Sequence, residues 1–257
     1  MGIAIRIADA TFTKHIGIAE IEDDPIIPDV PDEPTVHDTY PVTDTLKGLY
    51  YLGGTEAESL VNHAEGGSNA TVPSNSTFAV SDAYATFTGN EGSSRIATGI
   101  TTAPTNKTTI IGLFRVPTGV RVIASNRAYQ TSHITLTNWQ ASYRVGGTGS
   151  YTRFKDNQII NSDTNFALLA MTANTDGCRV VRHSDGELVE LANYSGGIDE
   201  WTTQQFFIGG AAANASENAT ADIALVSIHE GEMTDEQLQQ IFAHVRWYGE
   251  SKGLTIE

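Results

Sequence analysis

Aromatic and planar polar side chains gather in residues 126–155 of this 257-residue chain, and side chains of these kinds bind sugars. Aromatic faces stack on pyranose rings, while Arg, Asn and Asp side chains hydrogen-bond to the ring hydroxyls. The sequence therefore predicts a carbohydrate-binding platform made of Trp139, Tyr143, Arg144, Tyr151 and Arg153. The alternative is that alternate aromatic residues of this segment fill the protein core.

The stretch from Arg121 to Lys155 also forms a local basic cluster in a protein that is otherwise acidic. The chain holds 15 Lys and Arg against 31 Asp and Glu, a formal net charge of −16. Such a charge repels nucleic acid and anionic lipid headgroups. The basic cluster is suited to attract anionic surface glycans or an acidic neighbour, including this protein's own linker, and we expect neither nucleic acid nor insertion into a membrane.

Glycan cleavage requires two carboxylates that project from the same face of a strand. Glu20 and Glu22 have the strand period of two, but they run directly into a proline-rich segment. Glu187 and Glu190 are three residues apart, so they face opposite sides of a strand. The chain contains no Gly-x-Ser-x-Gly, His-Glu-x-x-His or P-loop pattern. We therefore expect a protein that is not an enzyme.

Metal binding and disulfide formation have little support in the sequence. No catalytic metal or other cofactor is expected, and Cys178 is the only cysteine, so it has no internal partner. Calcium is the alternative, because loop Asp and Asn oxygens bind it. The same residue types are what β-turns require. The calcium candidates are Asp156 with Asn157, Asp163, Asn174 with Asp176, and Asp185. We expect His229 and His244 to be structural residues.

A stiff acidic linker is predicted over residues 22–44. Residues 20–44 contain nine acidic residues, no Lys or Arg, and five of the eight prolines. Pro25, Pro28, Pro31 and Pro34 recur every third residue, which favours extended polyproline geometry.

Residues 1–21 precede this linker and are predicted to form a β arm for assembly. Apolar residues alternate there with polar or small ones, as in one or two strands. Two strands alone are marginal in water, so we expect them to add to a sheet, preferably on a neighbouring subunit of a homo-oligomer. The arm residues are Ile3, Ile5, Ile7, Phe12, Ile16 and Ile18. Charged residues interrupt the apolar positions, so no signal peptide is expected.

Residues 45–257 are predicted to form one β domain of short strands and polar turns. Asp-Gly turns separate Phe166–Thr172, Cys178–His183 and Glu187–Leu191, which should form an antiparallel meander. Thr108–Val116 and Arg121–Ser125 are strands separated by a turn at Pro117-Thr118-Gly119. Two more strands are predicted at Phe206–Gly209 and Ala221–His229.

One helix closes the domain. Thr234 and Gln237 have the spacing of a capping box, and Met233 can pack on Leu238. The apolar face that follows must pack on the sheet; its residues are Leu238, Ile241, Phe242, Val245 and Tyr248.

These features resemble the concanavalin A-like (LamG/pentraxin-type) jelly roll. The resemblance lies in residues 46–72 (LKGLYYLGG and SLVNHAEGGSNATV), in Phe166–Leu191, and in Phe206–Gly210 followed by ADIALVSIHEGEMTDEQLQQIF. It covers about 200 residues, and its motifs are structural turns and caps. The resemblance implies an all-β sandwich of the jelly-roll type with one short C-terminal helix.

The opening MGIAIRIADATFTKHIGIAEI resembles the start of many bacteriophage and prophage proteins that carry this lectin-like domain, although Thr11-Phe12-Thr13 stands where they have Asp-Phe-Ser. The resemblance implies a non-enzymatic virion surface protein, a tail-fibre, baseplate-associated or capsid-surface subunit, made in the host cytoplasm and used in host attachment or shell decoration. A stand-alone carbohydrate-binding module is the alternative, and a glycan-cleaving enzyme is a third reading.

Overall fold

The computed structural model describes residues 39–257 apart from short gaps. The gaps are residues 91, 102–106, 120, 127–132, 138–140, 145–150, 154–163, 175, 196–203 and 212–218. For a few strand residues, among them 133–134, 137, 141–144 and 151–153, only the backbone is described. The predicted β arm (1–21) and most of the predicted linker (22–44) lie outside the described residues.

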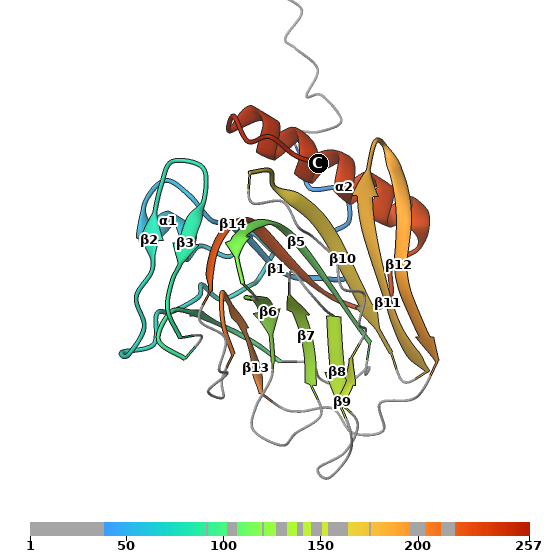
Figure 1. The fold of residues 1–257 in the computed structure, drawn as a ribbon, viewed down its shortest axis with the longest axis horizontal. Coiled ribbons are helices and arrows are strands. Elements are labelled where there is room, and N and C mark those ends of the chain that lie inside the picture. The colour runs from blue at the N-terminus through green and yellow to red at the C-terminus, as the bar shows by residue number, and fades with distance from the viewer. Residues whose placement is uncertain are drawn as a thin grey trace, which may run out of the picture. The chain divides into compact units, whose positions relative to one another are not determined.

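Two antiparallel sheets make up the described domain (Figure 1). The eight-stranded sheet contains β1 (Leu46–Tyr51), β2 (Ala79–Val80), β3 (Ala85–Phe87), β5 (Thr108–Thr118), β10 (Ala167–Ala173), β11 (Gly177–Ser184), β12 (Glu187–Ser195) and β14 (Thr220–Glu230). The six-stranded sheet contains β4 (Ile96–Thr101), β6 (Val122–Ser125), β7 (His133–Thr137), β8 (Ala141–Arg144), β9 (Tyr151–Arg153) and β13 (Gln205–Ile208). The helices are α1 (Glu56–Ser59) and α2 (Asp235–Ser251).

The predicted meander is confirmed as β10, β11 and β12, which pair antiparallel in chain order. Asp185, with a φ of 52°, and Gly186, with a φ of 84°, form the turn between β11 and β12. Positive φ at both central residues matches the right-handed twist of the two strands, and Asp-Gly supplies it at low cost. Cys178 on β11 points into the core and is 4% exposed.

The long strands β5 and β14 lie at the centre of the eight-stranded sheet and pair over most of their length. Their predicted positions are confirmed, but the predicted turn at Pro117-Thr118-Gly119 is wrong in part. β5 continues through Pro117 and ends at Thr118, directly before Gly119, where φ is 76°. The two strands that flank Gly119 belong to different sheets, so this connection crosses the sandwich instead of closing a hairpin.

Alternating apolar residues on the central strands build two cores. Ile110 and Phe114 of β5 face the six-stranded sheet, where they pack with residues such as Phe206. Ile111 and Leu113 face the opposite way, toward α2. A strand buried on both faces must be apolar at nearly every position, as the run from residue 110 to 116 is.

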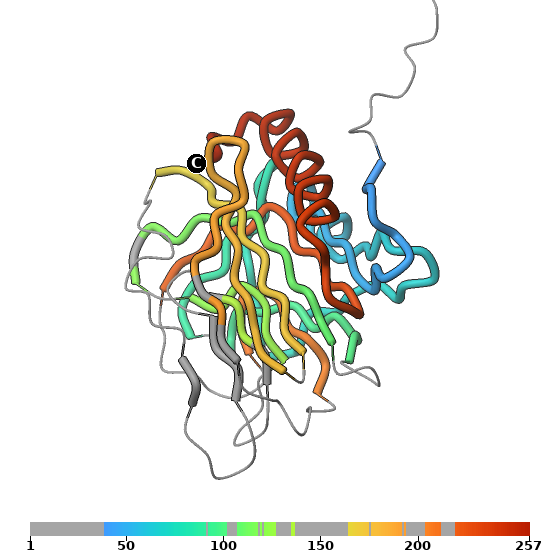
Figure 2. Tube along the Cα trace, turned by 90° about the vertical axis from the view of Figure 1, so that its right-hand side faces the viewer, coloured from blue at the N-terminus to red at the C-terminus, as the bar shows by residue number. Residues whose placement is uncertain are grey.

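The helix α2 covers the outer face of the eight-stranded sheet (Figure 2). Thr234 and Gln237 form the predicted capping box, so its beginning is confirmed. The predicted apolar face is buried and packs on the second core. The described domain is therefore an all-β sandwich with one C-terminal helix, as the sequence predicts.

Packing in the domain begins ahead of residue 45, the predicted domain start. Tyr40 is 9% exposed and Val42 is 6% exposed, and both belong to the core beneath α2. The Tyr40 ring meets the His244 ring of α2 edge to face at 5.3 Å. The first described residues are thus fixed to the helix-covered face.

Candidate functional site

Four of the five predicted carbohydrate-binding residues lie on two paired strands at one end of the six-stranded sheet. Tyr143 and Arg144 belong to β8, and Tyr151 and Arg153 belong to β9. In the backbone register Arg144 lies opposite Tyr151, and Tyr143 lies opposite Thr152. Trp139 lies outside the described residues. The fold thus brings the four positions to one sheet edge, where β9 is the last strand of the sheet's described order.

Arg121 does not belong to a basic surface cluster, so the prediction is wrong at this end of the segment. Its side chain is fully buried. The guanidinium donates hydrogen bonds to the carbonyl oxygens of Gly209 (2.8 Å), Ser94 (2.7 Å), Ala219 (3.1 Å) and Gly89. Gly89 and Ser94 lie in the connection between β3 and β4, and Gly209 and Ala219 lie between β13 and β14, so Arg121 ties two connections together. Its role is structural because none of this charge reaches the surface.

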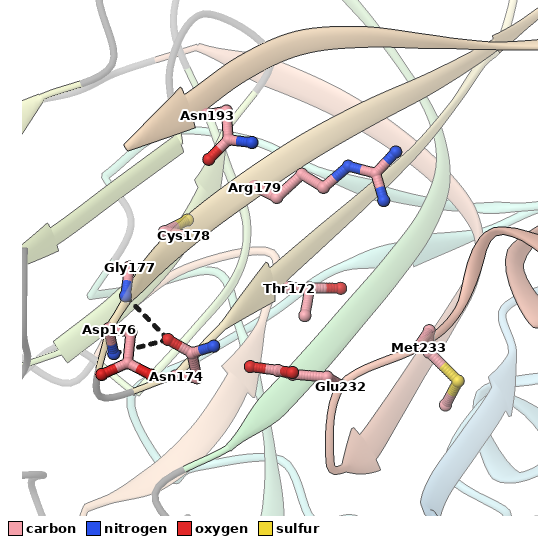
Figure 3. Close-up of a pocket in the computed structure, with 9 residues that line it drawn as sticks. All are labelled: Thr172, Asn174, Asp176, Gly177, Cys178, Arg179, Asn193, Glu232 and Met233. Carbon is pink, nitrogen blue, oxygen red and sulfur yellow. Dashed lines mark hydrogen bonds between the residues drawn. The ribbon is translucent and has the colours of Figure 1, made fainter. Parts of the chain in front are cut away.

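An open hollow of about 310 Å³ lies beside the β10–β11 hairpin (Figure 3). Asn174, one of the calcium candidates, lines it, but its Oδ1 accepts hydrogen bonds from the backbone amides of Asp176 (2.6 Å) and Gly177 (2.7 Å). This Asx turn explains why the hairpin carries Asn at that position.

The other calcium candidates are a turn residue and three residues outside the described part of the chain. Asp185 is an exposed turn residue, and Asp156, Asn157 and Asp163 lie outside the described residues. Within the part of the chain that the structure describes, no three His, Cys, Asp or Glu side chains are grouped so as to hold a metal ion.

Arg179 lies at the upper rim of the same hollow and joins two carboxylates. It contacts Asp235 at 2.6 Å, at the beginning of α2, and Glu190 on β12 at 2.8 Å. The hydrogen bond that Arg179 donates to Asp235 is the main reason why the pKa of Arg179 is raised, and the bond to Glu190 raises it further. Glu190 is therefore engaged in an ion pair at the surface.

His229 and His244 are structural residues, as predicted. His229 is fully buried; its Nε2 lies 2.9 Å from the Tyr40 hydroxyl and its Nδ1 lies 3.2 Å from the Thr45 hydroxyl. Burial lowers the pKa of His229 to about 3, so the ring is neutral. His244 is 3% exposed, and its Nε2 lies 3.0 Å from the Tyr51 hydroxyl.

A larger hollow, of about 800 Å³, was not expected from the sequence. We call it the β1–β4 groove, and its walls come from within residues 43–47, residues 65–68, residues 98–101 and Glu230. Inside this groove Lys47 Nζ lies 2.8 Å from Glu230 Oε2, and the two side chains form an ion pair. These segments are distant in sequence, and only the pairing of β1 with β14 brings Lys47 to Glu230.

Asn62 holds the loop wall of the β1–β4 groove in place. The Asn62 side chain is 8% exposed; its Oδ1 accepts from the amides of Leu49 and Ala64, both at 3.0 Å, and its Nδ2 donates to the carbonyl of Lys47 at 3.1 Å. At Gly67 a Cβ atom would lie 2.2 Å from Asn62 Nδ2, so the close approach requires glycine. The hydrogen bonds of Asn62 therefore keep this loop wall in one ordered turn.

Comparisons with known proteins are limited to structure. No family model and no curated protein matches the sequence. The receptor-binding domain of a botulinum neurotoxin C/D mosaic serotype matches with a TM-score of 0.57 and 13% identity over 79% of this chain and 52% of that one. The binding domain of Paraclostridial Mosquitocidal Protein 1 matches with a TM-score of 0.56 and 14% identity over 80% of this chain and 53% of that one. This chain therefore spans about half the length of either toxin domain.

Domain 4 of AbnA, an extracellular arabinanase from Geobacillus stearothermophilus whose structure contains arabinotriose, is matched almost completely. The TM-score is 0.57 at 15% identity, and the match covers 77% of this chain and 98% of that domain. At these identities the similarity establishes the fold, a two-sheet β-sandwich, and leaves the ligand open. No helix among the described residues is long and apolar enough to cross a membrane.

Proposed function

We propose that this chain is a non-enzymatic subunit of a bacteriophage virion, which displays a lectin-like sandwich on the virion surface for host attachment or shell decoration. The sandwich presents the β8–β9 edge to a host glycan, and residues 1–38 join the subunit to its neighbours. The sequence supports the second part through its alternating arm and its acidic, proline-spaced linker.

The polarity of the sandwich is the observation that carries this proposal. The described chain begins on the helix-covered face, where the Tyr40 ring packs on His244. The strands β8 and β9 lie at the far end of the domain from α2 (Figure 1). A domain attached at one end thus offers its predicted ligand strands at the other, which is what display requires.

The mass of the protein in solution tests the assembly part. We expect the full chain to be a homo-oligomer by light scattering, and a chain that lacks residues 1–38 to be a monomer. The deletion ends before Tyr40 because the buried Tyr40 and Val42 belong to the domain. A monomeric full chain, or an oligomer that survives the deletion, would contradict assembly through residues 1–38.

A stand-alone carbohydrate-binding module is the second candidate. The nearly complete coverage of AbnA domain 4, a part of a glycan-degrading enzyme, favours it. On this reading the full chain is monomeric and binds glycan without residues 1–38. Neither candidate releases reducing ends from polysaccharides, and a release above background would favour the enzyme reading over both.

A further inference from the structure

We propose that the β1–β4 groove is a glycan-binding site for uncharged oligosaccharides, separate from the β8–β9 edge. This inference rests on the proposed glycan-binding function and names a ligand class for it. At about 800 Å³ the groove has the size of small-molecule sites, and short oligosaccharides fit such a volume. β4 and β9 are the two end strands of the six-stranded sheet, so the two sites lie at opposite edges.

Both walls of the groove are held in place by hydrogen bonds. Asn62 fixes the loop wall, as described above. On the β4 wall the Gly99 amide donates to Gln205 Oε1 at 2.7 Å, and the Thr98 hydroxyl donates to the Phe206 carbonyl at 2.8 Å. A site whose walls are already ordered loses little conformational entropy when a ligand binds.

The backbone is open to the groove at two lining glycines. Gly66 and Gly99 have φ values of 70° and 73°, and a Cβ atom at either position would meet no atom within 4 Å. Space is therefore free directly above the backbone of both walls. A ligand that hydrogen-bonds to peptide groups can approach closely there.

The ion pair between Lys47 and Glu230 suits a sugar diol. One hydroxyl of the diol donates to the Glu230 carboxylate and its neighbour accepts from the Lys47 ammonium, and hydrogen bonds to charged groups are the stronger kind. Both side chains are accessible, with 47% and 24% of their surfaces exposed. The hydroxyls of Thr43, Ser68 and Thr101 add further polar partners along the groove.

The charge of the groove determines the class of glycan. Asp44, Glu65 and Glu230 contribute three carboxylates to its lining, against the single ammonium of Lys47. The net negative charge repels sialylated or otherwise anionic sugars, and the overall charge of −16 acts in the same direction. An uncharged oligosaccharide is the ligand that this lining accepts.

Calorimetric titration of the full chain with three probes tests the proposal. Arabinotriose and cellotriose are uncharged, and sialyllactose is anionic. We expect at least one uncharged trisaccharide to bind. Thr101→Trp should lower its affinity by about tenfold or more, which corresponds to the loss of about 1.4 kcal/mol, because the indole fills the groove. Thr255→Trp, at another exposed threonine outside the groove, should leave the affinity unchanged.

A second pair of variants tests the proposal even if Thr101→Trp does not fold. Lys47→Met removes the ammonium without adding bulk, and we expect it to weaken binding about threefold or more. Lys252→Met is its control at an exposed lysine outside the groove. Thermal unfolding of each variant confirms that it is folded.

The outcomes separate this inference from the proposed function. If an uncharged probe binds and neither groove variant weakens it, or if only sialyllactose binds, the groove proposal is overturned while a glycan-binding function stands. If none of the three probes binds, the groove proposal is overturned, and the glycan-binding part of the proposed function must then be judged on the β8–β9 variants and a wider glycan panel.

Discussion

The hydroxyl oxygen of Tyr40 lies 2.7 Å from the hydroxyl oxygen of Ser227, although 187 positions separate the two residues in the chain. The contact is buried and continues to His229, whose Nε2 lies 2.9 Å from the same phenol oxygen. If Tyr40 donates to Ser227, the neutral Nε2–H tautomer of His229 donates to Tyr40 and its Nδ1 accepts from Thr45. One short chain of hydrogen bonds thus fixes the beginning of the domain to its central strand.

Removal of the Tyr40 hydroxyl should destabilise the whole domain. In Tyr40→Phe, Ser227 and His229 keep their burial but lose a partner, and we expect the free energy of unfolding to fall by about 1–3 kcal/mol. Urea denaturation measures this change. Tyr40→Ala also removes the ring and should cost more. An unchanged unfolding midpoint in both variants would show that residues near 40 are not part of the cooperative unit.

Stability should decrease as the pH falls below about 6.5. The folded chain keeps His229 neutral down to a pKa of about 3, whereas the unfolded chain takes up a proton near the ordinary value of 6.5. Between these values the unfolded state binds more protons, so stability rises with pH by at most about 1.4 kcal/mol per unit from this residue.

Chemical denaturation at several pH values, compared with His229→Gln, isolates this contribution. Burial also lowers the pKa of His63 and His183, so some slope of the same sign remains in the variant. Protonation of carboxylates at low pH also changes the stability of both proteins. An identical pH dependence of the wild type and His229→Gln would refute a neutral buried His229.

Arg121→Met should be among the most damaging single substitutions. It leaves the carbonyl oxygens of Gly209, Ser94, Ala219 and Gly89 without this donor, and we expect a loss of about 3 kcal/mol or more of unfolding free energy. Arg179→Met, at a partly exposed arginine whose ion pairs with Asp235 and Glu190 lie at the surface, should cost less than about 1 kcal/mol. Equal losses in the two variants would contradict the difference in burial on which the prediction rests.

The double variant Trp139→Ala, Tyr143→Ala tests the β8–β9 edge. If these rings form an exposed platform, glycan binding there should disappear while the unfolding midpoint hardly changes, because stacking on aromatic faces carries much of the binding energy. If the rings instead fill the core, the midpoint should fall by the several kcal/mol typical of lost aromatic burial. Glycan binding and thermal unfolding, measured on the same sample, distinguish the two.

Local patterns were sufficient to predict much of the fold. The Asp185-Gly186 turn and the Thr234–Gln237 capping box act within a few residues, so their effect can be read without knowledge of the rest of the chain. The β-branched run at Thr108–Val116 indicated a strand for the same reason. Continuation of β5 through Pro117 could not be foreseen, because it depends on the pairing with β14.

The sites were harder to predict because they depend on long-range contacts. In the sequence Arg121 is indistinguishable from a basic surface residue. Its burial becomes visible only when the fold brings the β3–β4 and β13–β14 connections around its side chain. The β1–β4 groove needs Lys47 beside Glu230, which no spacing encodes. The one local signal was the Gly66–Gly67 pair after Asn62, since adjacent glycines often mark a close backbone approach.

Because Cys178 is buried, the reactivity of its thiol can be used to measure local opening of the sheet. With the sulfur in the core, the pKa of the thiol is raised, so little reactive thiolate forms in the closed state. A thiol reagent will modify this single position only when β11 separates from its neighbours. The modification rate in native buffer therefore reads out how often the β10–β12 meander opens, without any engineered label.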